Sequence, residues 1–273
     1  MSGYKRVVVT GATSGLGREI AVQLARRGWK IAVTGRRVEE LEKTARLIAE
    51  AGGEALVLPG SVVDDGEVRA HYARIKAAWG GVDWAILNAG VSEYMNAKEF
   101  KAELVRWTFD VNVLGACRWI EAVLPGMLEQ GSGVVAGISS LAAFRGLPSS
   151  GPYSASKAAL SALLESTRVD LRGTGVDVVT VCPGFVKSEM TRRNDPRSMP
   201  FLMETPAGAA AVVAGIEARR RVVHFPWQLS YAMKYAVGSM PDFAYDWLAQ
   251  KLSYLRRKEP SAEAARIMRV GGA

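Results

Sequence analysis

A tyrosine and a lysine four residues apart, Tyr153 and Lys157, are the side chains of this sequence best suited to acid–base chemistry. On a helix, residues at this spacing lie on one face, so the phenol and the ammonium would share a small volume. A phenol with an ordinary pKa near 10 transfers protons poorly at neutral pH, and a neighbouring cation lowers that pKa. Two unit charges ~4 Å apart interact by roughly 4 kcal/mol at an effective dielectric of about 20, enough to shift the pKa by a few units. The pair suits proton transfer to or from an alcohol oxygen.

A serine hydroxyl is placed to assist this pair. Ser140 follows the apolar run 134–139, and a strand that ended in a loop there would hold the hydroxyl beside a substrate oxygen. A tyrosine and a lysine at this spacing alone are most often a solvated helix face. The interpretation therefore depends on the elements that surround the three residues.

The first of these elements is a glycine-rich turn after the β-branched run that ends at Thr10. Gly11, Gly15 and Gly17 stand in the spacing G-x-x-x-G-x-G, and a helical pattern of apolar residues follows them. Glycines let the backbone approach a pyrophosphate, and the helix N-terminus favours its negative charge. Because strand, turn and helix occur in this order, the motif indicates a dinucleotide site. A plain tight turn is the alternative.

The second strand, 30–34, ends in Gly35, Arg36 and Arg37, with no acidic residue at the strand end. An acidic residue at this point would bind the ribose 2′-hydroxyl of NAD, whereas arginine accommodates the 2′-phosphate of NADP. The sequence therefore favours NADP(H) over NAD(H). The alternative is that both arginines only cover the surface before the next helix.

Helical and strand patterns then alternate along the chain. Helices are expected at 38–51, 65–79, 103–127 and 153–172, and strands at 54–58, 82–87, 133–139 and 176–182. This alternation predicts an α/β fold of the Rossmann type, a doubly wound parallel sheet with helices on both faces. In such folds ligands bind beyond the carboxyl ends of the strands, where all of the motifs above fall.

Taken together, these residues resemble the short-chain dehydrogenase/reductase family over roughly residues 5 to 225. The motifs that carry the resemblance are Thr10–Gly17, Asn88-Ala89-Gly90, Asn112, Ser140, Tyr153 with Lys157, and Pro183-Gly184. The resemblance implies reversible hydride transfer between NAD(P)(H) and an alcohol or carbonyl compound.

The resemblance also implies catalytic roles. Tyr153 would be the general acid or base, Lys157 would lower its pKa and bind the nicotinamide ribose, and Ser140 would polarise the carbonyl. Asn112 would support a water that links Lys157 to solvent.

Cofactor contacts are implied in the same way, and they fall at the ends of several strands. The cofactor-binding set is Gly11, Thr13, Ser14, Gly15, Leu16, Gly17, Arg36, Arg37, Ser61, Val62, Asn88, Ala89, Gly90, Tyr153, Lys157, Pro183, Gly184, Phe185, Val186 and Ser188. Two positions depart from the family pattern. Ser61 stands where an aspartate usually contacts the adenine, so an altered contact is expected, and Ser188 stands where threonine is more usual.

Composition excludes several other classes of protein. The net charge is +8, but no zinc-finger spacing, RNA-binding aromatic signature or basic tail accompanies it, so a generally basic surface is favoured over nucleic-acid binding. Cys117, Cys182, His71 and His224 are isolated, and no metal site is expected. No secretory segment precedes Val7, no stretch reaches ~18 uninterrupted apolar residues, and a cytoplasmic protein is predicted.

Two segments after the sixth strand bear on the substrate. Residues 187–205 are expected to form a long loop rich in Met190, Met199, Phe201 and Leu202, which predicts a lid over an apolar substrate. A surface loop that packs on its own domain is the alternative. One catalytic domain is expected at 1–225. A helical hairpin at 226–258 would serve the pocket wall, a subunit interface or, less favoured, an interfacial membrane anchor. A poorly ordered tail is expected at 259–273.

The sequence thus predicts an NADP(H)-dependent oxidoreductase acting on a ketone or aldehyde and the matching alcohol, assembled as a homodimer or homotetramer. A 3-oxoacyl-thioester reductase is the nearest alternative, since such members of the family carry the same motifs. An alternative of another class is a non-catalytic protein, regulatory or membrane-peripheral, that only binds the cofactor. The presence of all four catalytic residue types argues against it, because a non-catalytic protein has no chemical need for that set.

Overall fold

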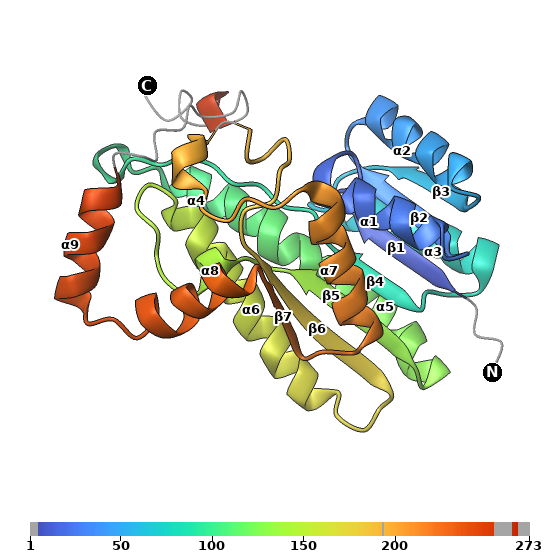
Figure 1. Cartoon of the computed structure of the whole chain (residues 1–273). Coiled ribbons are helices and arrows are strands. Elements are labelled where there is room, and N and C mark those ends of the chain that lie inside the picture. The colour runs from blue at the N-terminus through green and yellow to red at the C-terminus, as the bar shows by residue number, and fades with distance from the viewer. Residues whose placement is uncertain (1–4, 193, 254–263, 267–273) are drawn as a thin grey trace.

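Parallel strands form one sheet in the order β3-β2-β1-β4-β5-β6-β7 in the computed structural model, which describes residues 5–192, 194–253 and 264–266 (Figure 1). The strands are β1 (Arg6–Thr10), β2 (Lys30–Gly35), β3 (Glu54–Pro59), β4 (Trp84–Leu87), β5 (Gly133–Ile138), β6 (Val176–Pro183) and β7 (Val222–Phe225). The strand order reverses between β1 and β4, so the crevice where a doubly wound sheet binds ligands lies beyond their carboxyl ends.

Helices cover both faces of this sheet, as the alternating pattern predicts (Figure 1). They are α1 (Gly15–Ala25), α2 (Val38–Glu50), α3 (Asp65–Trp79), α4 (Ala102–Phe109), α5 (Gly115–Gln130), α6 (Gly151–Asp170), α7 (Thr205–Glu217), α8 (Trp227–Tyr231) and α9 (Asp242–Ser253). Apolar residues of α1, α2 and α7 pack on one face, and those of α3, α5 and α6 pack on the other. The predicted Rossmann-type fold is confirmed.

Continuous apolar runs in the strands explain the two-sided core. Val7 and Val9 of β1 belong to the cluster under α1 and α7, while Val8 belongs to the cluster under α5 and α6. Successive side chains of a strand point to opposite faces, so a strand covered on both faces needs apolar residues at every position. β7 is an edge strand, with Val222 exposed and His224 half-buried, and the sequence pattern did not predict it.

The long helical stretch that contains Asn112 is interrupted by a π-helical turn. α4 ends at Phe109, the turn spans Asp110–Leu114, and α5 continues to Gln130 with Pro125 inside it. By length and hydropathy the stretch Ala102–Gln130 could span a membrane. Its apolar side chains Trp119, Val123 and Met127 are buried against the sheet, which is the environment of a core helix.

The segment after β7 is helical, with a π-helical turn (Ala232–Val237) between α8 and α9. The side chain of Arg145 donates to Asp242 of α9 at 2.6 Å, and the Tyr245 hydroxyl donates to the Gly146 carbonyl. α9 is therefore held against the loop that follows Ser140. The predicted continuation of this helix to 258, and the predicted tail apart from 264–266, lie outside the described residues.

Candidate active site

A cavity of about 1460 Å³ opens at the carboxyl ends of the strands and collects nearly all of the predicted site residues. Those that line it are Gly11, Thr13, Ser14, Gly15, Leu16, Arg36, Arg37, Ser61, Val62, Asn88, Ala89, Gly90, Ser140, Tyr153, Lys157, Pro183, Gly184, Phe185, Val186 and Ser188. Gly17 and Asn112 lie behind the wall. Because these residues come from six strand ends, the fold itself brings them together.

The glycine turn between β1 and α1 is fixed by close backbone contacts. Gly11 has a φ of +66° and Gly15 a φ of +54°, a region that other residues rarely adopt. A Cβ at Gly11 would lie 2.8 Å from the Cα of Ala89, and one at Gly17 would lie 2.6 Å from the Gly11 carbonyl oxygen. The turn therefore presents bare backbone to the cavity, as binding of a pyrophosphate requires.

Asn88 supports this turn from within the protein. Its side-chain amide donates to the carbonyls of Thr10 and Gly11 at 3.0 and 3.2 Å. The Thr10 hydroxyl in turn accepts from the backbone N–H groups of Asn88 and Ala89, both at 3.0 Å. These bonds tie the end of β4 to the glycine turn, so the Asn88 side chain positions the backbone that lines the cavity.

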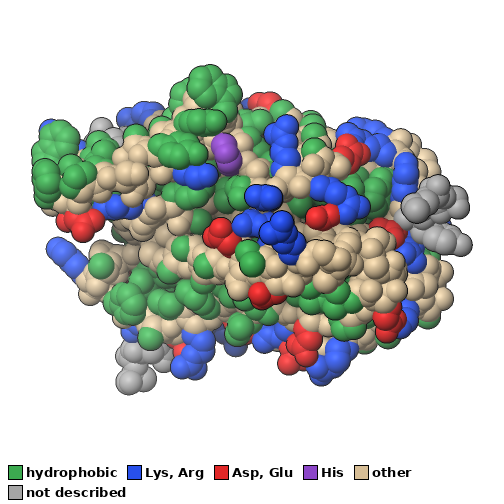
Figure 2. Space-filling model, turned by 90° about the horizontal axis from the view of Figure 1, so that it is seen from below, with side chains coloured by type: hydrophobic (Ala, Val, Ile, Leu, Met, Phe, Trp, Pro, Cys, Tyr) green, Lys and Arg blue, Asp and Glu red, His purple; other side chains and the backbone are tan. Residues whose placement is uncertain are grey.

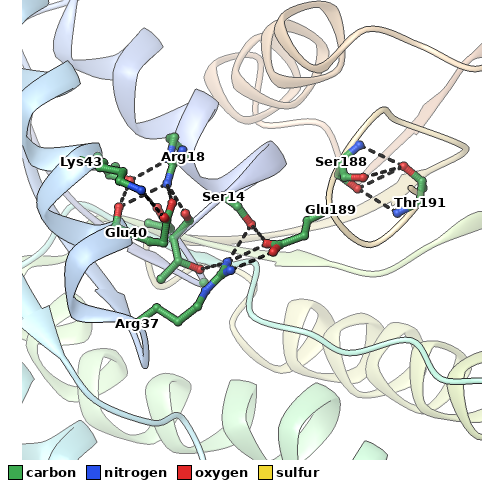
Figure 3. Close-up of polar contacts among 12 residues, drawn as sticks. Ser14, Arg18, Arg37, Glu40, Lys43, Ser188, Glu189 and Thr191 are labelled. Atoms are coloured by element: carbon green, nitrogen blue, oxygen red, sulfur yellow. Dashed lines mark hydrogen bonds and ion pairs between the residues drawn. The ribbon is translucent and has the colours of Figure 1, made fainter. Parts of the chain in front are cut away.

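Arg37 holds the strongest polar cluster at the cavity rim (Figure 3). Its guanidinium donates to both carboxylate oxygens of Glu189, at 2.8 and 2.7 Å, and to the hydroxyls of Thr13 and Ser14, at 3.1 and 3.2 Å. The Ser14 hydroxyl also donates to Glu189 at 2.9 Å. Hydrogen bonding to Arg37 lowers the pKa of Glu189, so this carboxyl is charged at neutral pH. Arg36, the neighbour of Arg37, also lines the cavity.

The adenine side of the cavity departs from the family pattern as the sequence indicates. The Ser61 hydroxyl accepts from the backbone N–H of Val63 at 3.4 Å, and the Ser61 N–H donates to Glu67 at 2.6 Å. Ser61 and Val62 both line the cavity. No carboxylate stands at the Ser61 position.

Ser140, Tyr153 and Lys157 meet at one wall of the cavity, at the end of β5 and the start of α6. The Ser140 hydroxyl accepts from the backbone N–H of Ala142 at 3.1 Å and interacts with the Tyr153 phenol, whose pKa it lowers. The Lys157 ammonium, almost fully buried, donates to the Ile138 carbonyl at 2.7 Å and lies 5.8 Å from the centre of the Tyr153 ring. The predicted trio is therefore assembled in one place.

Burial shifts the pKa values of both titratable groups of this trio. It raises the pKa of Tyr153, and the interaction with Ser140 opposes that rise. It lowers the pKa of Lys157 to about 8. The Lys157 ammonium is directed at the Ile138 carbonyl, and the lowering of the Tyr153 pKa by this ammonium stays a prediction.

Asn112 lies behind the cavity in the π-helical turn, where irregular helices often mark functional positions. Its side-chain carbonyl accepts from the Val91 N–H at 2.7 Å, and its amide donates to the Val91 carbonyl and the Ser156 hydroxyl, both at 2.9 Å. A Cβ at Gly90 would lie 3.2 Å from Asn112 Oδ1 and 3.3 Å from Lys157 Nζ. Asn112 thus fixes the loop beside Lys157, and its part in a proton relay stays a prediction.

The segment after β6 borders the cavity through only some of the residues expected. Met190 and Pro200 line the cavity, whereas Met199, Phe201 and Leu202 do not. Phe201 has a φ of +56° and is 54% exposed, so the expectation that it flanks the pocket is wrong. Backbone pairing of Val186 with Met203 closes the base of the segment and turns Phe201 outward.

Several site residues escaped the sequence analysis. Glu189 belongs to no family motif, and only its contact with Arg37 identifies it as a residue of the site. Trp107 and Leu147 also line the cavity without any sequence signal for it. Leu229 and Met233, from α8 and the turn after it, line the cavity as well, which agrees with the pocket wall that is one of the three uses predicted for 226–258. The apolar wall is therefore built by residues far apart in the sequence.

The residues present fit a dinucleotide. The bare glycine turn, the N-terminus of α1 and the hydroxyls of Thr13 and Ser14 provide donors suited to phosphates. Ser14 caps no N–H of α1, so the first turn keeps its donors for an anion. The glycine turn lines the same cavity as Ser140 and Tyr153, so one dinucleotide could reach from the turn to these two residues.

Comparisons with known proteins agree with this geometry. A family model described as short chain dehydrogenase matches residues 5–198. An uncharacterized oxidoreductase of Myxococcus xanthus is 44% identical over 91% of this chain and 98% of its own. A very-long-chain 3-oxoacyl-CoA reductase of Anas platyrhynchos is 33% identical over 78% of this chain and 69% of its own. Among solved structures, an alcohol dehydrogenase from Thermococcus sibiricus complexed with 5-hydroxy-NADP superposes with a TM-score of 0.73. It is 27% identical and covers 81% of this chain and 94% of its own.

Proposed function

Because the chain belongs to the short-chain dehydrogenase/reductase family and is an oxidoreductase, we propose that it is an NADP(H)-dependent enzyme that interconverts a ketone or aldehyde and the matching alcohol. The observation that carries the proposal is the convergence of Ser140, Tyr153 and Lys157 on one wall of a cavity. The glycine turn and two arginines lie on the same cavity. Proton transfer and dinucleotide binding are thereby provided in a single site.

The chain's own residues serve the oxygen of the substrate. Tyr153 donates its phenolic proton to the carbonyl oxygen during reduction and takes a proton from the alcohol during oxidation. The Ser140 hydroxyl donates a hydrogen bond to the same oxygen and stabilises the charge that develops there. The Lys157 ammonium binds the nicotinamide ribose and keeps a positive charge behind the phenol. When bound, the nicotinamide supplies or accepts the hydride.

The preference for NADP(H) rests on the rim of the cavity. Arg36 and Arg37 follow β2, where an NAD-specific site would carry a carboxylate that accepts from the ribose hydroxyls. The Arg37 guanidinium already binds a carboxylate in bidentate fashion, a geometry that suits a phosphate equally well. The family uses NAD(P)(H), and the name of the Thermococcus sibiricus structure includes an NADP derivative.

An apolar substrate is supported by apolar side chains in the lining of the cavity. Trp107, Leu147, Leu229 and Met233 belong to that lining, together with Met190 from the loop after β6. Ser140 and Tyr153, which line the same cavity, would orient the reacting oxygen. Such a pattern is usual for pockets that take apolar small molecules.

Substitution of Tyr153 by Phe tests the catalytic proposal directly. NADPH-dependent reduction of apolar ketones and aldehydes, followed at 340 nm, should fall by about a thousandfold or more in Tyr153→Phe, because the proton donor is lost. NADPH binding should stay within about threefold of that of the native protein. A non-catalytic cofactor-binding protein would show no turnover of any carbonyl compound in either form.

A second candidate is reduction of 3-oxoacyl thioesters. The name of the Anas platyrhynchos relative favours it, and the apolar wall would also accept an acyl chain. Comparing kcat/KM for a 3-oxoacyl thioester with that for a free ketone of equal chain length separates the two. A large advantage of the thioester would replace the first proposal with the second.

Assembly and location are proposed on similar grounds. Exposed Leu114 and Leu128 on the α4–α5 stretch, with Leu163 on α6, favour a homodimer or homotetramer through these helices. Sedimentation velocity would refute this by showing a monomer at micromolar concentration. We propose a cytoplasmic protein, although α8, α9 and the turn between them carry the exposed aromatic residues Trp227, Tyr231, Tyr235, Phe243 and Trp247. Figure 2 shows hydrophobic side chains gathered at the left end of its view. Flotation with anionic liposomes would overturn a purely cytoplasmic location.

A further inference from the structure

The rim of the cofactor cavity contains a carboxylate in the place where the proposed cofactor would bring an anion. Glu189 lies one residue after Ser188 in the segment that follows β6, while Arg37 follows β2 (Figure 3). Both residues line the same cavity. Their contact therefore joins the two sides of the cavity mouth.

Arg37 and Ser14 hold the Glu189 carboxylate in the way that an anion-binding site holds its ligand. Each carboxylate oxygen of Glu189 accepts from one terminal nitrogen of Arg37, at 2.8 and 2.7 Å, and Ser14 adds a hydroxyl donor at 2.9 Å. Arg37 is held in place by Thr13 and Ser14 as well as by Glu189. A guanidinium fork and a hydroxyl at the start of a helix are the donors that a phosphate monoester prefers.

We propose that Glu189 is a self-ligand that occupies the 2′-phosphate subsite of the free protein and is displaced when NADP(H) binds. The proposal rests on the proposed preference for NADP(H). Two anions cannot share Arg37 and Ser14 at hydrogen-bonding distance, because like charges a few ångströms apart repel. The carboxylate must leave for the phosphate to enter.

The exposure of the pair makes such an exchange feasible. Both side chains are 47% exposed, and ion pairs in contact with water are weak. A phosphate carries more charge and more acceptor oxygens than the carboxylate, so it competes successfully for the same donors. Glu189 consequently reduces the affinity for a 2′-phosphate without blocking it.

Release of Glu189 would also free one end of the segment over the cavity. The base of this segment is fixed, since the N–H of Lys187 donates to Met203 and the N–H of Met203 donates to Phe185, both at 2.9 Å. Movement is therefore confined to residues beyond Ser188, among them Met190 in the cavity wall. Occupation of the 2′-phosphate subsite would in this way be communicated to the substrate end of the cavity.

The test compares two ligands that differ only by the phosphate in question, adenosine 2′,5′-bisphosphate and adenosine 5′-phosphate. Calorimetric titration should show that Glu189→Gln binds the bisphosphate about threefold to tenfold more tightly than the native protein does. Binding of the 5′-phosphate should change by less than about twofold. In the free protein, amide hydrogen exchange at 188–192 should become faster in Glu189→Gln.

Glu204→Gln is the matched control, because Glu204 is also exposed, belongs to the same segment and pairs with Lys187 away from Arg37. It changes the net charge equally and should leave both affinities unaltered. Unchanged or weaker bisphosphate binding in Glu189→Gln would overturn the proposal, as would an equal gain for both ligands. Weaker NADH binding in this variant would assign Glu189 to the ribose hydroxyls instead.

The preference for NADP(H) is decided separately, by the affinities of the native protein for NADPH and NADH. If the native protein prefers NADH and Glu189→Gln still gains affinity for the bisphosphate, the proposal for Glu189 is supported and the proposed preference for NADP(H) is wrong. If the native protein prefers NADPH and Glu189→Gln has no effect on bisphosphate binding, the preference is supported and the proposal for Glu189 is wrong. Each failure can therefore be recognised on its own.

Discussion

Lys157 illustrates how a functional residue can oppose stability. The residue is 3% exposed, and its ammonium donates to the Ile138 carbonyl at 2.7 Å. Burial lowers its pKa from 10.5 to about 8, which means that the folded state disfavours the charge. Under the proposed function, this charge serves catalysis and the binding of the nicotinamide ribose.

Replacing Lys157 by Met should therefore stabilise the fold while abolishing turnover. At pH 7 we expect the free energy of unfolding to rise by about 1–2 kcal/mol, since an apolar side chain of similar length replaces a buried ion. Between pH 8 and 10.5, Lys157 of the unsubstituted protein binds more protons in the unfolded state than in the folded state. The free energy of unfolding of the unsubstituted protein therefore increases with pH in this range. The advantage of Lys157→Met should be complete below pH 8 and shrink towards pH 10.5.

Urea unfolding at pH 7 and pH 10 measures this difference. A variant less stable than the native protein at both values would show that the ammonium contributes favourable contacts that exceed its desolvation. A constant advantage across the pH range would place the Lys157 pKa near its ordinary value.

At the scale of elements, Arg6 at the start of β1 joins the start of β4 to the carboxyl-terminal ends of α3 and α5, on the side of the sheet away from the cavity. It donates to both carboxylate oxygens of Asp83 before β4, to the carbonyl of Trp79 at the end of α3, and to Gln130 at the end of α5. The arginine side chain is 10% exposed. Such a buried pair is costly to break, because its partner is left charged and unpaired.

Arg6→Met should lower the free energy of unfolding by about 2–4 kcal/mol, measured by urea titration. Arg106→Ala is the control, since Arg106 pairs with Glu103 on the exposed side of α4 and should cost less than about 0.5 kcal/mol. Equal effects of the two substitutions would show that the Arg6 cluster contributes no more than a surface ion pair.

α8 is the element whose role in the site the structure makes most explicit. Leu229 lies in the cavity wall and would be 3.1 Å from a Cβ at Gly184, so the helix is seated on the end of β6. Leu229→Ala should raise KM for large apolar ketones by about fivefold to tenfold, with little change in kcat, because the lost contact is made equally in the ground state. Leu128→Ala, an exposed leucine of α5, should change neither constant.

A fall in kcat instead of a rise in KM would mean that α8 acts on the reacting groups and not only on binding. Steady-state kinetics with one long and one short ketone separates these outcomes. The short ketone should be insensitive to Leu229→Ala.

The sequence predicts those features of the fold and site that are encoded by residues close together in the chain. The glycine turn, Ser140 and the pair Tyr153 and Lys157 are encoded by neighbouring residues, and these predictions agree with the structure. The contact of Glu189 with Arg37 joins residues 152 positions apart, and no pattern announces it. Phe201 was misplaced because apolar character does not tell which way a loop residue points.

At the scale of the whole molecule, the net charge of +8 suits an anionic cofactor. The cavity concentrates part of this charge, because Arg36, Arg37 and Arg192 all line it. NADPH carries more negative charge than NADH, so the basic rim should favour it most at low ionic strength. The balance of charge, the arginines after β2 and the glycine turn thus support the same cofactor.

The most direct test of the account is a fluorescence titration of the native protein with NADPH and with NADH at one ionic strength. We predict that NADPH binds at least about tenfold more tightly and that Arg37→Ala removes most of this difference, since the phosphate loses its bidentate partner. Arg74→Ala, an exposed arginine of α3 outside the cavity, should leave the difference intact. Equal affinities, or tighter binding of NADH, would contradict the account.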